Sequence, residues 1–326
     1  MSIEWNASAD RPDCGHLRLR AALNRRLRAF FERRGVLEVE TPILAAAGTT
    51  DPNIESFVTR FEGPVAAAPG PRWLRTSPEF ALKRLLAAGV GDCFELGRVF
   101  RNGEAGRRHN PEFTLLEWYR VGWDHRRLAH EVRDLVQDAL ALAGCTAEYA
   151  EFSYRQWFLD GLGIDPFEAG TDVLRAPLAG FRIAPDGLGR DDWLDLLVTH
   201  RLQPGLPSGR ITCIHDYPPT QAALARIRDG DPPVAERFEI FLGSQELANG
   251  YHELCDPAEQ RARFEADNRR RAERGQAQVP IDERLLAVLA RMPDCAGVAL
   301  GVDRLLMALA GTDDLREVLA IPFAVA

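Results

Sequence analysis

The chain has 326 residues, of which 46% are hydrophobic and 27% are charged, a composition typical of a folded globular protein. No run of about 18 apolar residues occurs and the N-terminus does not resemble a signal peptide, so we expect a cytoplasmic protein without a membrane span. The net charge of −8 argues against a broad nucleic-acid-binding surface, which needs a continuous basic footprint. The six cysteines are scattered without metal-ligand spacing, which predicts reduced and mostly buried thiols.

Apolar spacing and turn residues predict helices and strands along the whole chain. Residues 17–34 carry leucine and phenylalanine at helical spacing, and Gly35 lies where a helix C-terminus is capped. Segment 36–44 alternates and is rich in β-branched residues up to Pro42, which predicts a strand that ends there. The later predicted elements are strands over 94–101 and 112–119, a helix over 124–144, a helical insertion at about 145–233, a hairpin over 237–254, a charged helix over 257–274, and a strand followed by a helix over 297–311.

A further helix is predicted to begin at Ser77-Pro78-Glu79 and to end at Gly89. Ser77 is the expected N-cap, and proline is favoured at the first helical position because its missing N–H would have no partner there. Glu79 then lies near the positive end of the helix dipole.

The strands 94–101 and 112–119 are predicted to form a hairpin whose loop is longer than the turn requires, and such loops are often functional. Because side chains alternate along a strand, Phe113, Leu115, Glu117 and Tyr119 are expected to share one face. This spacing places a carboxylate and a phenol side by side.

Arg101 begins this loop and Asn110 lies near its end. A guanidinium can bind two oxygens of a phosphate at once, and Phe113 beyond it could stack on a nucleotide base. An ordinary hairpin with a salt-bridged arginine is the alternative.

Glu246 and Glu253 flank the pair Asn249-Gly250. A spacing of seven would put them on opposite faces of a regular strand, so we expect a bulge at Asn249-Gly250 to bring them to one face. Two carboxylates directed at one point need a cation between them, either Mg²⁺ or a substrate ammonium group. Two solvent-facing glutamates on an edge hairpin remain the alternative.

The segment 297–311 is expected to bind an anion such as a terminal phosphate. Gly297 and Gly301 permit close approach of the backbone, and Arg304 falls in the first turn of the helix, where the dipole is positive. Simple packing of the helix on the strand is the alternative. His109 and His252 have no metal-ligand spacing and are interpreted as loop or packing residues.

Together these segments resemble the signature motifs of class II aminoacyl-tRNA synthetases, in particular their lysyl branch. The helix 17–34 and its continuation to Pro42 resemble motif 1, the dimer element. FRNGEAGRRHNPEFT (100–114) resembles motif 2, and GVALGVDR (297–304) resembles motif 3. TSPEFALKRLL (76–86) and ELANGYHEL (246–254) are similar to the amino-acid and metal-binding segments of the lysyl enzymes.

Two features differ from a true lysyl-tRNA synthetase. Motif 1 is reached within about twenty residues, whereas lysyl enzymes carry an anticodon-binding domain before it, so no anticodon recognition is expected. Ala299 stands where lysyl enzymes have glycine. Both features resemble the bacterial paralogues that ligate (R)-β-lysine to elongation factor P.

The resemblance implies a role for each matching residue. Arg101 and Arg304 are the expected catalytic residues and hold the α- and γ-phosphates of ATP. The expected ATP site comprises Arg101, Asn102, Gly103, Glu104, Asn110, Phe113, Glu246, Leu247, Gly301 and Arg304. The expected substrate pocket comprises Ser77, Pro78, Glu79, Glu117, Tyr119, Glu253 and Ala299, and Glu246 and Glu253 are the expected metal ligands. Gly103 departs from motif 2, which has a glutamate at this position.

We therefore predict an α+β fold with the class II catalytic core, a mainly antiparallel sheet flanked by helices. Residues 1–16 are expected to be an N-terminal tail and residues 17–326 a single catalytic domain. The predicted enzyme is an ATP- and Mg²⁺-dependent ligase that activates (R)-β-lysine or lysine, transfers it to elongation factor P, and forms a homodimer. A minimal lysyl-tRNA ligase, a catalytically silent paralogue and an asparagine-synthetase-like enzyme are the alternatives.

Overall fold

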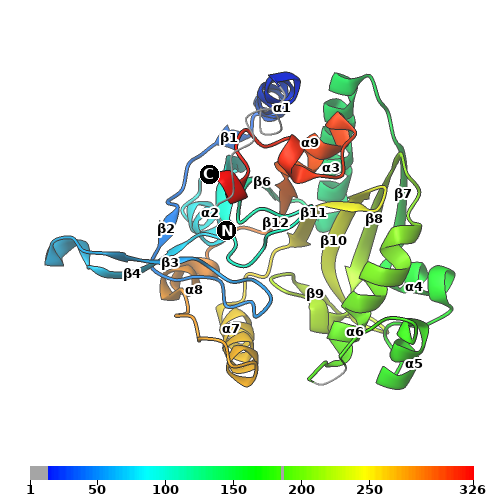
Figure 1. Ribbon diagram of the computed structural model, residues 1–326. Helices are drawn as coiled ribbons and strands as arrows, with labels where there is room; N and C mark the ends of the chain where they lie inside the picture. Colours follow the sequence, from blue (N-terminus) through cyan, green and yellow to red (C-terminus); the bar gives the residue numbers. More distant parts are fainter. Residues whose placement is uncertain (1–13, 185–186) are drawn as a thin grey trace, which may run out of the picture.

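The computed structural model describes residues 14–184 and 187–326 (Figure 1). In chain order, its helices and main strands are α1 (Cys14–Glu32), β1 (Leu37–Glu38), β2 (Leu44–Ala45), β3 (Val58–Phe61), β4 (Gly70–Leu74), α2 (Glu79–Ala87), β5 (Cys93–Phe100), β6 (Glu112–Val121), α3 (His125–Leu140), β7 (Glu148–Ser153), α4 (Tyr154–Leu162), α5 (Thr171–Arg175), α6 (Arg190–Leu197), β8 (Arg210–Tyr217), β9 (Ile227–Arg228), β10 (Val234–Leu242), β11 (Gln245–His252), α7 (Pro257–Glu273), α8 (Glu283–Leu289), β12 (Cys295–Gly301) and α9 (Val302–Ala310). No helix among these residues is both long and apolar enough to cross a membrane.

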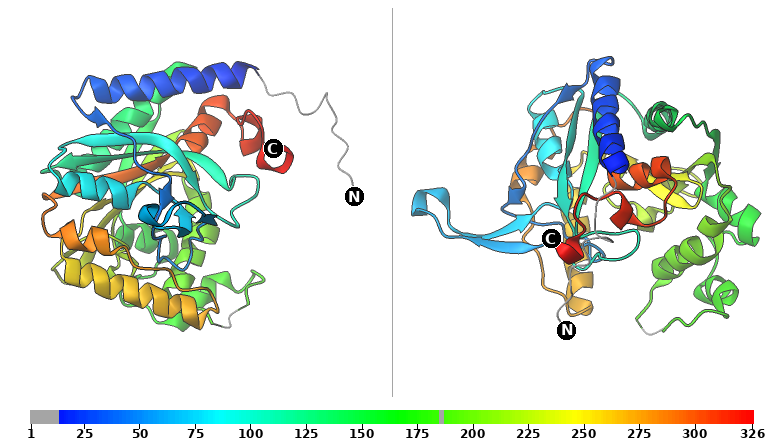
Figure 2. Two further views of the ribbon diagram at one scale, coloured as in Figure 1. Left: turned by 90° about the vertical axis from the view of Figure 1, so that its left-hand side faces the viewer. Right: turned by 45° about the horizontal axis from the view of Figure 1, so that its top comes forward.

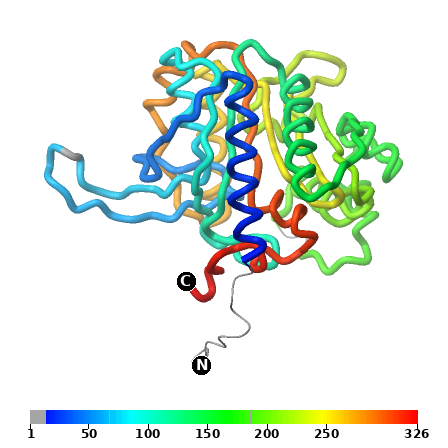
Figure 3. Tube along the Cα trace, turned by 90° about the horizontal axis from the view of Figure 1, so that it is seen from above, coloured from blue at the N-terminus to red at the C-terminus, as the bar shows by residue number. Residues whose placement is uncertain are grey.

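A nine-stranded sheet forms the centre of the fold. Its strand order is β1-β5-β6-β12-β11-β10-β8-β7, and β9 pairs with β10. All of its pairs are antiparallel except β1 with β5 and β7 with β8. The predicted α+β fold with a mainly antiparallel sheet is confirmed. A separate three-stranded sheet, β2-β4-β3, includes a hairpin that projects from the body of the molecule (Figures 1 and 3).

One face of the large sheet is covered by α1, α3 and α9 (Figure 2). The helical spacing recognised in the sequence accounts for α1, since Leu23, Leu27, Phe30 and Phe31 are all buried. The ring of Phe31 stacks on Phe94 of β5 with the ring centres 4.5 Å apart. Burial of each such side chain stabilises the fold by about 1.5–3 kcal/mol, which anchors α1 along the sheet.

Among the described residues, helices cover the opposite face only at its two ends. Helices α4, α5 and α6 pack at the β8 and β10 end, and α2, α7 and α8 pack near β5 and β12. The middle strands β6, β12 and β11 therefore have one face available for a site.

Several predicted boundaries differ from the structure. The helix expected over 17–34 begins at Cys14, so the end of the expected tail 1–16 forms its first turn, and residues 1–13 lie outside the described residues. The strand expected over 36–44 is reduced to the two short strands β1 and β2, interrupted before and at Pro42. The insertion expected to be helical at 145–233 also contains β7 and β8, which extend the large sheet.

All six cysteines are free, as expected for reduced thiols. Cys93, Cys213 and Cys295 are buried, Cys255 is half-buried, and Cys14 and Cys145 are exposed.

Candidate functional site

A cavity of about 980 Å³ lies over β6, β12 and β11, where the helices leave the sheet uncovered. It also reaches the loop at 44–54, the start of α2 and part of the inserted region. Fifteen of the expected site residues line this cavity, namely Ser77, Pro78, Glu79, Arg101, Glu104, Asn110, Phe113, Glu117, Tyr119, Glu246, Leu247, Glu253, Ala299, Gly301 and Arg304. Asn102 and Gly103 do not line it. Segments far apart in the sequence thus meet at one site.

The face of β6 predicted from side-chain alternation is the floor of the cavity, since Phe113, Leu115, Glu117 and Tyr119 all line it. On the neighbouring strand β12, Gly297 lies opposite Tyr119. A Cβ atom at position 297 would lie 2.3 Å from Tyr119 and 2.5 Å from Glu253. Only glycine therefore lets the phenol of Tyr119 and the carboxylate of Glu253 lie over this strand.

A β-bulge brings Glu246 and Glu253 to the same face, but it is not at the predicted place. The pairing of β10 with β11 shifts so that Ile240 is opposite Ala248 and Phe241 is opposite Glu246, which leaves Leu247 as the extra residue. Asn249-Gly250 continues the regular ladder. Gly250 is instead required for packing, because a Cβ there would lie 2.5 Å from Phe238.

An acidic group of side chains encloses the only lysine of the chain. The Nζ atom of Lys83 lies 2.7 Å from Oε1 of Glu79 and 2.7 Å from Oε2 of Glu253. Lys83 and Glu253 are each 1% exposed. Burial lowers the pKa of Lys83, but the two carboxylates raise it by more, so the lysine stays charged. The attraction between Lys83 and the two carboxylates thus fixes all three side chains in place.

Glu117 is buried next to this group without an ion pair among the described residues. Its carboxylate accepts hydrogen bonds from the hydroxyl of Ser77 at 2.7 Å and the phenol of Tyr119 at 2.9 Å. Burial, reinforced by the negative charge of Glu79, raises the pKa of Glu117 to about 8. A bound ammonium group would supply the positive charge that this carboxylate lacks.

The start of α2 differs slightly from the prediction. The helix begins at Glu79 and Pro78 occupies the N-cap position, one residue later than expected. Ser77 still caps the turn, because its hydroxyl oxygen accepts the N–H of Glu79 at 2.9 Å. This hydroxyl therefore fixes the helix start and holds Glu117 at the same time.

The other end of the cavity contains two guanidinium groups. The guanidinium of Arg101 lies over the ring of Phe113 at 5.2 Å, and its buried Nε atom has no hydrogen-bond partner within the described chain. Arg304 donates to the carbonyl oxygen of Glu246 at 3.0 Å and contacts Nε2 of His109, also at 3.0 Å. Burial and the adjacent Arg304 lower the pKa of His109, so its neutral ring can accept this hydrogen bond. An unpartnered N–H beside a second guanidinium suits an anion such as a phosphate.

The backbone explains why glycine occupies position 103. Gly103 has a φ of +85°, which side-chain-bearing residues rarely adopt. Glu104, the next residue, lines the cavity and lies 3.7 Å from Arg101. The loop therefore presents a carboxylate to the cavity one position later than motif 2 predicts.

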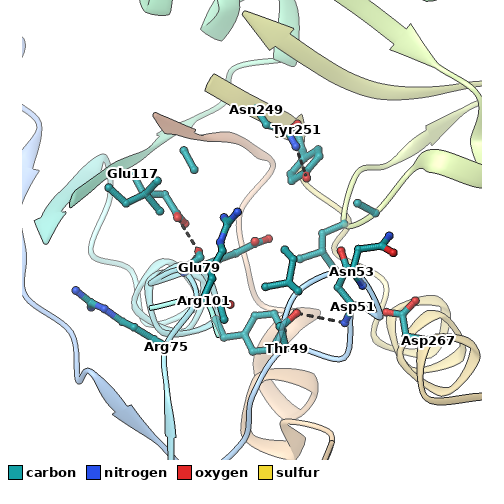
Figure 4. Close-up of a pocket in the computed structure, with 18 of the residues that line it drawn as sticks. Thr49, Asp51, Asn53, Arg75, Glu79, Arg101, Glu117, Asn249, Tyr251 and Asp267 are labelled. Carbon is teal, nitrogen blue, oxygen red and sulfur yellow. Dashed lines mark hydrogen bonds between the residues drawn. The ribbon is translucent and has the colours of Figure 1, made fainter. Parts of the chain in front are cut away.

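Lys83, which pairs with two cavity residues but does not line the cavity itself, was not recognised in the sequence. Two groups that do line the cavity were also not recognised (Figure 4). Asn249 and Tyr251 of β11 face the cavity, and the amide of Asn249 donates to the Tyr251 hydroxyl at 3.1 Å. Thr49, Asp51 and Asn53 belong to a loop whose pattern gave no signal.

Family comparison agrees with this geometry. Residues 14–324 match the model of the class II tRNA synthetases (D, K and N). The chain belongs to this family. Its members activate an amino acid with ATP, and class II synthetases in general use Mg²⁺. This membership makes the chain one of a family of ligases.

The residues present fit a magnesium ion at one place. The carboxylate of Glu246 is partly exposed at the cavity beside Arg304, and carboxylate oxygen is a ligand that Mg²⁺ prefers. Glu253 was also expected to bind the metal. In the structure this buried carboxylate pairs with Lys83, and its role as a metal ligand stays a prediction.

Proposed function

We propose that the chain activates a lysine-like amino acid, (R)-β-lysine or lysine, as an aminoacyl-adenylate and transfers it to the ε-amine of a lysine of elongation factor P. The observation that carries this proposal is the coexistence in one cavity of an acidic pocket around Glu117 and a guanidinium pair, Arg101 and Arg304. The first suits a substrate with ammonium groups, and the second suits the phosphates of ATP.

The acidic pocket favours lysine over aspartate and asparagine, the other two amino acids of this family. An aspartate-binding pocket would need a cation for the side-chain carboxylate, whereas three carboxyl groups, those of Glu79, Glu117 and Glu253, line the space in front of β6. Lys83 pairs with two of them, Glu79 and Glu253. The third, Glu117, is left to attract the substrate.

Ala299 favours a β-amino acid as the substrate. A β-amino acid substrate in turn supports elongation factor P as the acceptor. Ala299 lies on β12 between Glu117 of β6 and Asn249 of β11, and it lines the cavity. A methyl group at this point takes space from the floor of the pocket relative to glycine. We propose that this displaces an α-amino group and accommodates the shifted amine of (R)-β-lysine.

The proposed chemistry follows from positioning and charge. An oxygen of the substrate carboxylate attacks the α-phosphorus of ATP in line, the bond to the β-phosphate oxygen breaks, and pyrophosphate leaves. Arg101 orients and neutralises the α-phosphate, and Arg304 neutralises the departing phosphates. A magnesium ion held by Glu246 would add positive charge at the phosphates. The acceptor amine then attacks the acyl carbon, AMP leaves, and the amine's proton passes to solvent.

The domain boundaries and the assembly form part of the same proposal. Residues 17–326 act as a single catalytic domain, with the region at about 145–233 inserted into it. The enzyme is a homodimer formed through the motif 1 segment.

Pyrophosphate exchange tests the first step. We expect exchange with (R)-β-lysine to exceed exchange with L-α-lysine, and neither aspartate nor asparagine to support it. Arg101→Ala should abolish exchange in a folded protein. Arg107→Ala is the matched control, because Arg107 lies in the same loop but its exposed side chain pairs with Asp313 outside the cavity. Near-normal exchange by Arg101→Ala would refute the proposed role, and no exchange by the wild type would favour a silent paralogue.

Mass spectrometry of elongation factor P tests the second step. Incubation with enzyme, ATP and (R)-β-lysine should add one β-lysyl group, and substitution of the acceptor lysine by arginine should prevent the addition. If elongation factor P gains no mass while tRNA becomes charged, the chain is a lysyl-tRNA ligase instead.

A further inference from the structure

We propose that His125, Glu236 and His252 form a binding site for a divalent transition metal, with Zn²⁺ as the best-suited ion. The three side chains come from α3, β10 and β11, and none of them lines the cavity described above. They lie on the face of the sheet covered by α3, whereas the cavity lies on the other face. The site is therefore separate from the proposed magnesium position at Glu246.

The ligand geometry carries the proposal. One ligand atom from each of the three residues lies within 4.8 Å of the other two, so an ion between them would need only small side-chain movements. All three residues are buried. Two imidazoles and one carboxylate are a ligand set typical of zinc, and they leave a fourth position for water.

A second observation points to a missing ligand. The Nδ1 atom of His125 is buried and has no hydrogen-bond partner within the described chain. A buried polar atom without a partner costs free energy, and native structures rarely contain one. The residue is only 1% exposed, so bulk water does not satisfy this nitrogen. A metal ion would accept the lone pair of this nitrogen.

A carboxylate contacts the Nε2 atom of each histidine, on the side of the ring away from the proposed ion. Nε2 of His125 contacts Asp216 at 3.2 Å, and Nε2 of His252 contacts Asp294 at 3.0 Å. These contacts leave the Nδ1 atom of each ring for the metal. Metal-binding histidines typically donate their second ring N–H to a carboxylate in this way, which fixes the ring and raises its basicity.

Glu236 has one oxygen suited to the metal. Its Oε1 accepts a hydrogen bond from Arg228 at 2.8 Å, and its Oε2 lies 2.6 Å from Nδ1 of His252. An ion would replace the proton shared by Oε2 and Nδ1. The carboxylates at this site are Asp216, Glu236 and Asp294, and the guanidiniums that contact them are Arg226 and Arg228. Negative charge therefore exceeds positive charge around the three proposed ligands.

Such a site would join α3 to two central strands directly behind the amino-acid pocket. His252 immediately precedes Glu253, whose side chain points to the opposite face. An ion at His252 would restrain the backbone that positions Glu253. We therefore expect the metal to stabilise the fold rather than to take part in the chemistry.

Zinc loading of the full chain tests the proposal. The protein carrying Cys14→Ser and Cys145→Ser, which removes the two exposed thiols, is freed of metal with a chelator and titrated with Zn²⁺ against a chromophoric competitor. We expect one Zn²⁺ per chain and a rise in Tm. His125→Asn should weaken binding by at least about tenfold. His130→Asn, on the same helix but partly exposed and paired with Glu151, should bind as before.

A second variant and a spectroscopic measurement distinguish loss of the metal site from misfolding. Glu236→Gln keeps the size of the side chain and should also lose zinc binding, which guards against misfolding of the His125 variant. Co²⁺ in place of Zn²⁺ should give visible absorption bands in the parent protein that both variants lose. Less than stoichiometric zinc in the parent protein, or equal binding by both variants and the control, would overturn the proposal.

Discussion

Lys83 shows how one buried residue organises the proposed amino-acid pocket. Its ammonium group holds Glu79 and Glu253 at fixed positions within the cavity. The sequence did not reveal this role, because Lys83 follows Glu79 by four residues on a helix and the pair resembles an ordinary surface ion pair. Burial by α7, α8 and the sheet, which the local pattern cannot show, makes the pair part of the site.

Lys83→Met should therefore destabilise the protein and impair substrate binding. Removal of one partner of a buried ion pair leaves uncompensated charge, so we expect the free energy of unfolding to fall by about 3–5 kcal/mol. Urea unfolding measures this change. The double variant Lys83→Met/Glu253→Gln should recover much of the stability without recovering pyrophosphate exchange. A single variant as stable as the wild type would show that the pair contributes little.

The raised pKa of Glu117 predicts a pH dependence of substrate binding and also predicts its sign. Burial raises this pKa to about 8, so the carboxyl group is protonated at lower pH and ionised above it. An ammonium substrate binds the ionised form. The KM for the lysine-like substrate should therefore fall as the pH rises from about 6.5 to about 8.5, while the KM for ATP changes little.

The same raised pKa predicts the direction of the stability change. The fold favours the protonated form of Glu117, so its contribution is greatest below the unfolded pKa and is lost as the pH rises through about 8. Glu117→Gln cannot ionise and should show a flatter dependence of both KM and stability. A Gln variant with the same pH profile as the wild type would assign the effect to another group.

At the scale of elements, the spacing of β6, β12 and β11 determines which side chains reach the cavity. Alternation predicted the cavity face of β6 correctly, because β6 is regular over its length. The bulge in β11 was predicted at Asn249-Gly250, where the residue types tolerate unusual backbone angles, but it lies at Leu247. Local sequence could not place it, since the register depends on how β10 and β11 pair.

Gly297→Ala tests this spacing. The added methyl group would meet Tyr119 and Glu253 at distances no real Cβ adopts, so either the side chains or the strand must move. Overpacking of this kind costs about 1–3 kcal/mol of stability. Because the displaced groups belong to the proposed amino-acid pocket, we expect kcat/KM for the amino acid to fall by at least about tenfold, with little change for ATP.

Gly205→Ala is the matched control, because a Cβ at position 205 meets nothing within 4 Å. It should leave both exchange and Tm unchanged. If Gly297→Ala keeps wild-type kcat/KM, the close approach at β12 does not govern substrate binding.

At the scale of the whole molecule, the fold class and most of the residues that line the cavity could be predicted from the sequence, because each motif carries its own local signal. The sequence could not predict that β7 and β8, within an apparently helical region, extend the large sheet. Nor could it bring together His125, Glu236 and His252, which lie on three elements with no spacing pattern between them. Contacts of this kind arise only from the order of strands in the sheet.

The proposed homodimer is the last consequence at this scale. The motif 1 segment after α1 exposes apolar side chains, since Leu37 is 52%, Ile43 39% and Leu44 49% exposed. Contiguous exposed apolar patches mark surfaces that bind other molecules, and we propose that these side chains lie in the dimer interface. The double variant Leu37→Asp/Leu44→Asp should place like charges in a two-fold interface and produce monomers in sedimentation velocity, whereas we expect the wild type to sediment as a dimer. Phe181→Asp changes a similarly exposed residue in the inserted region and should remain dimeric. A double variant that sediments with the wild type would place the interface elsewhere.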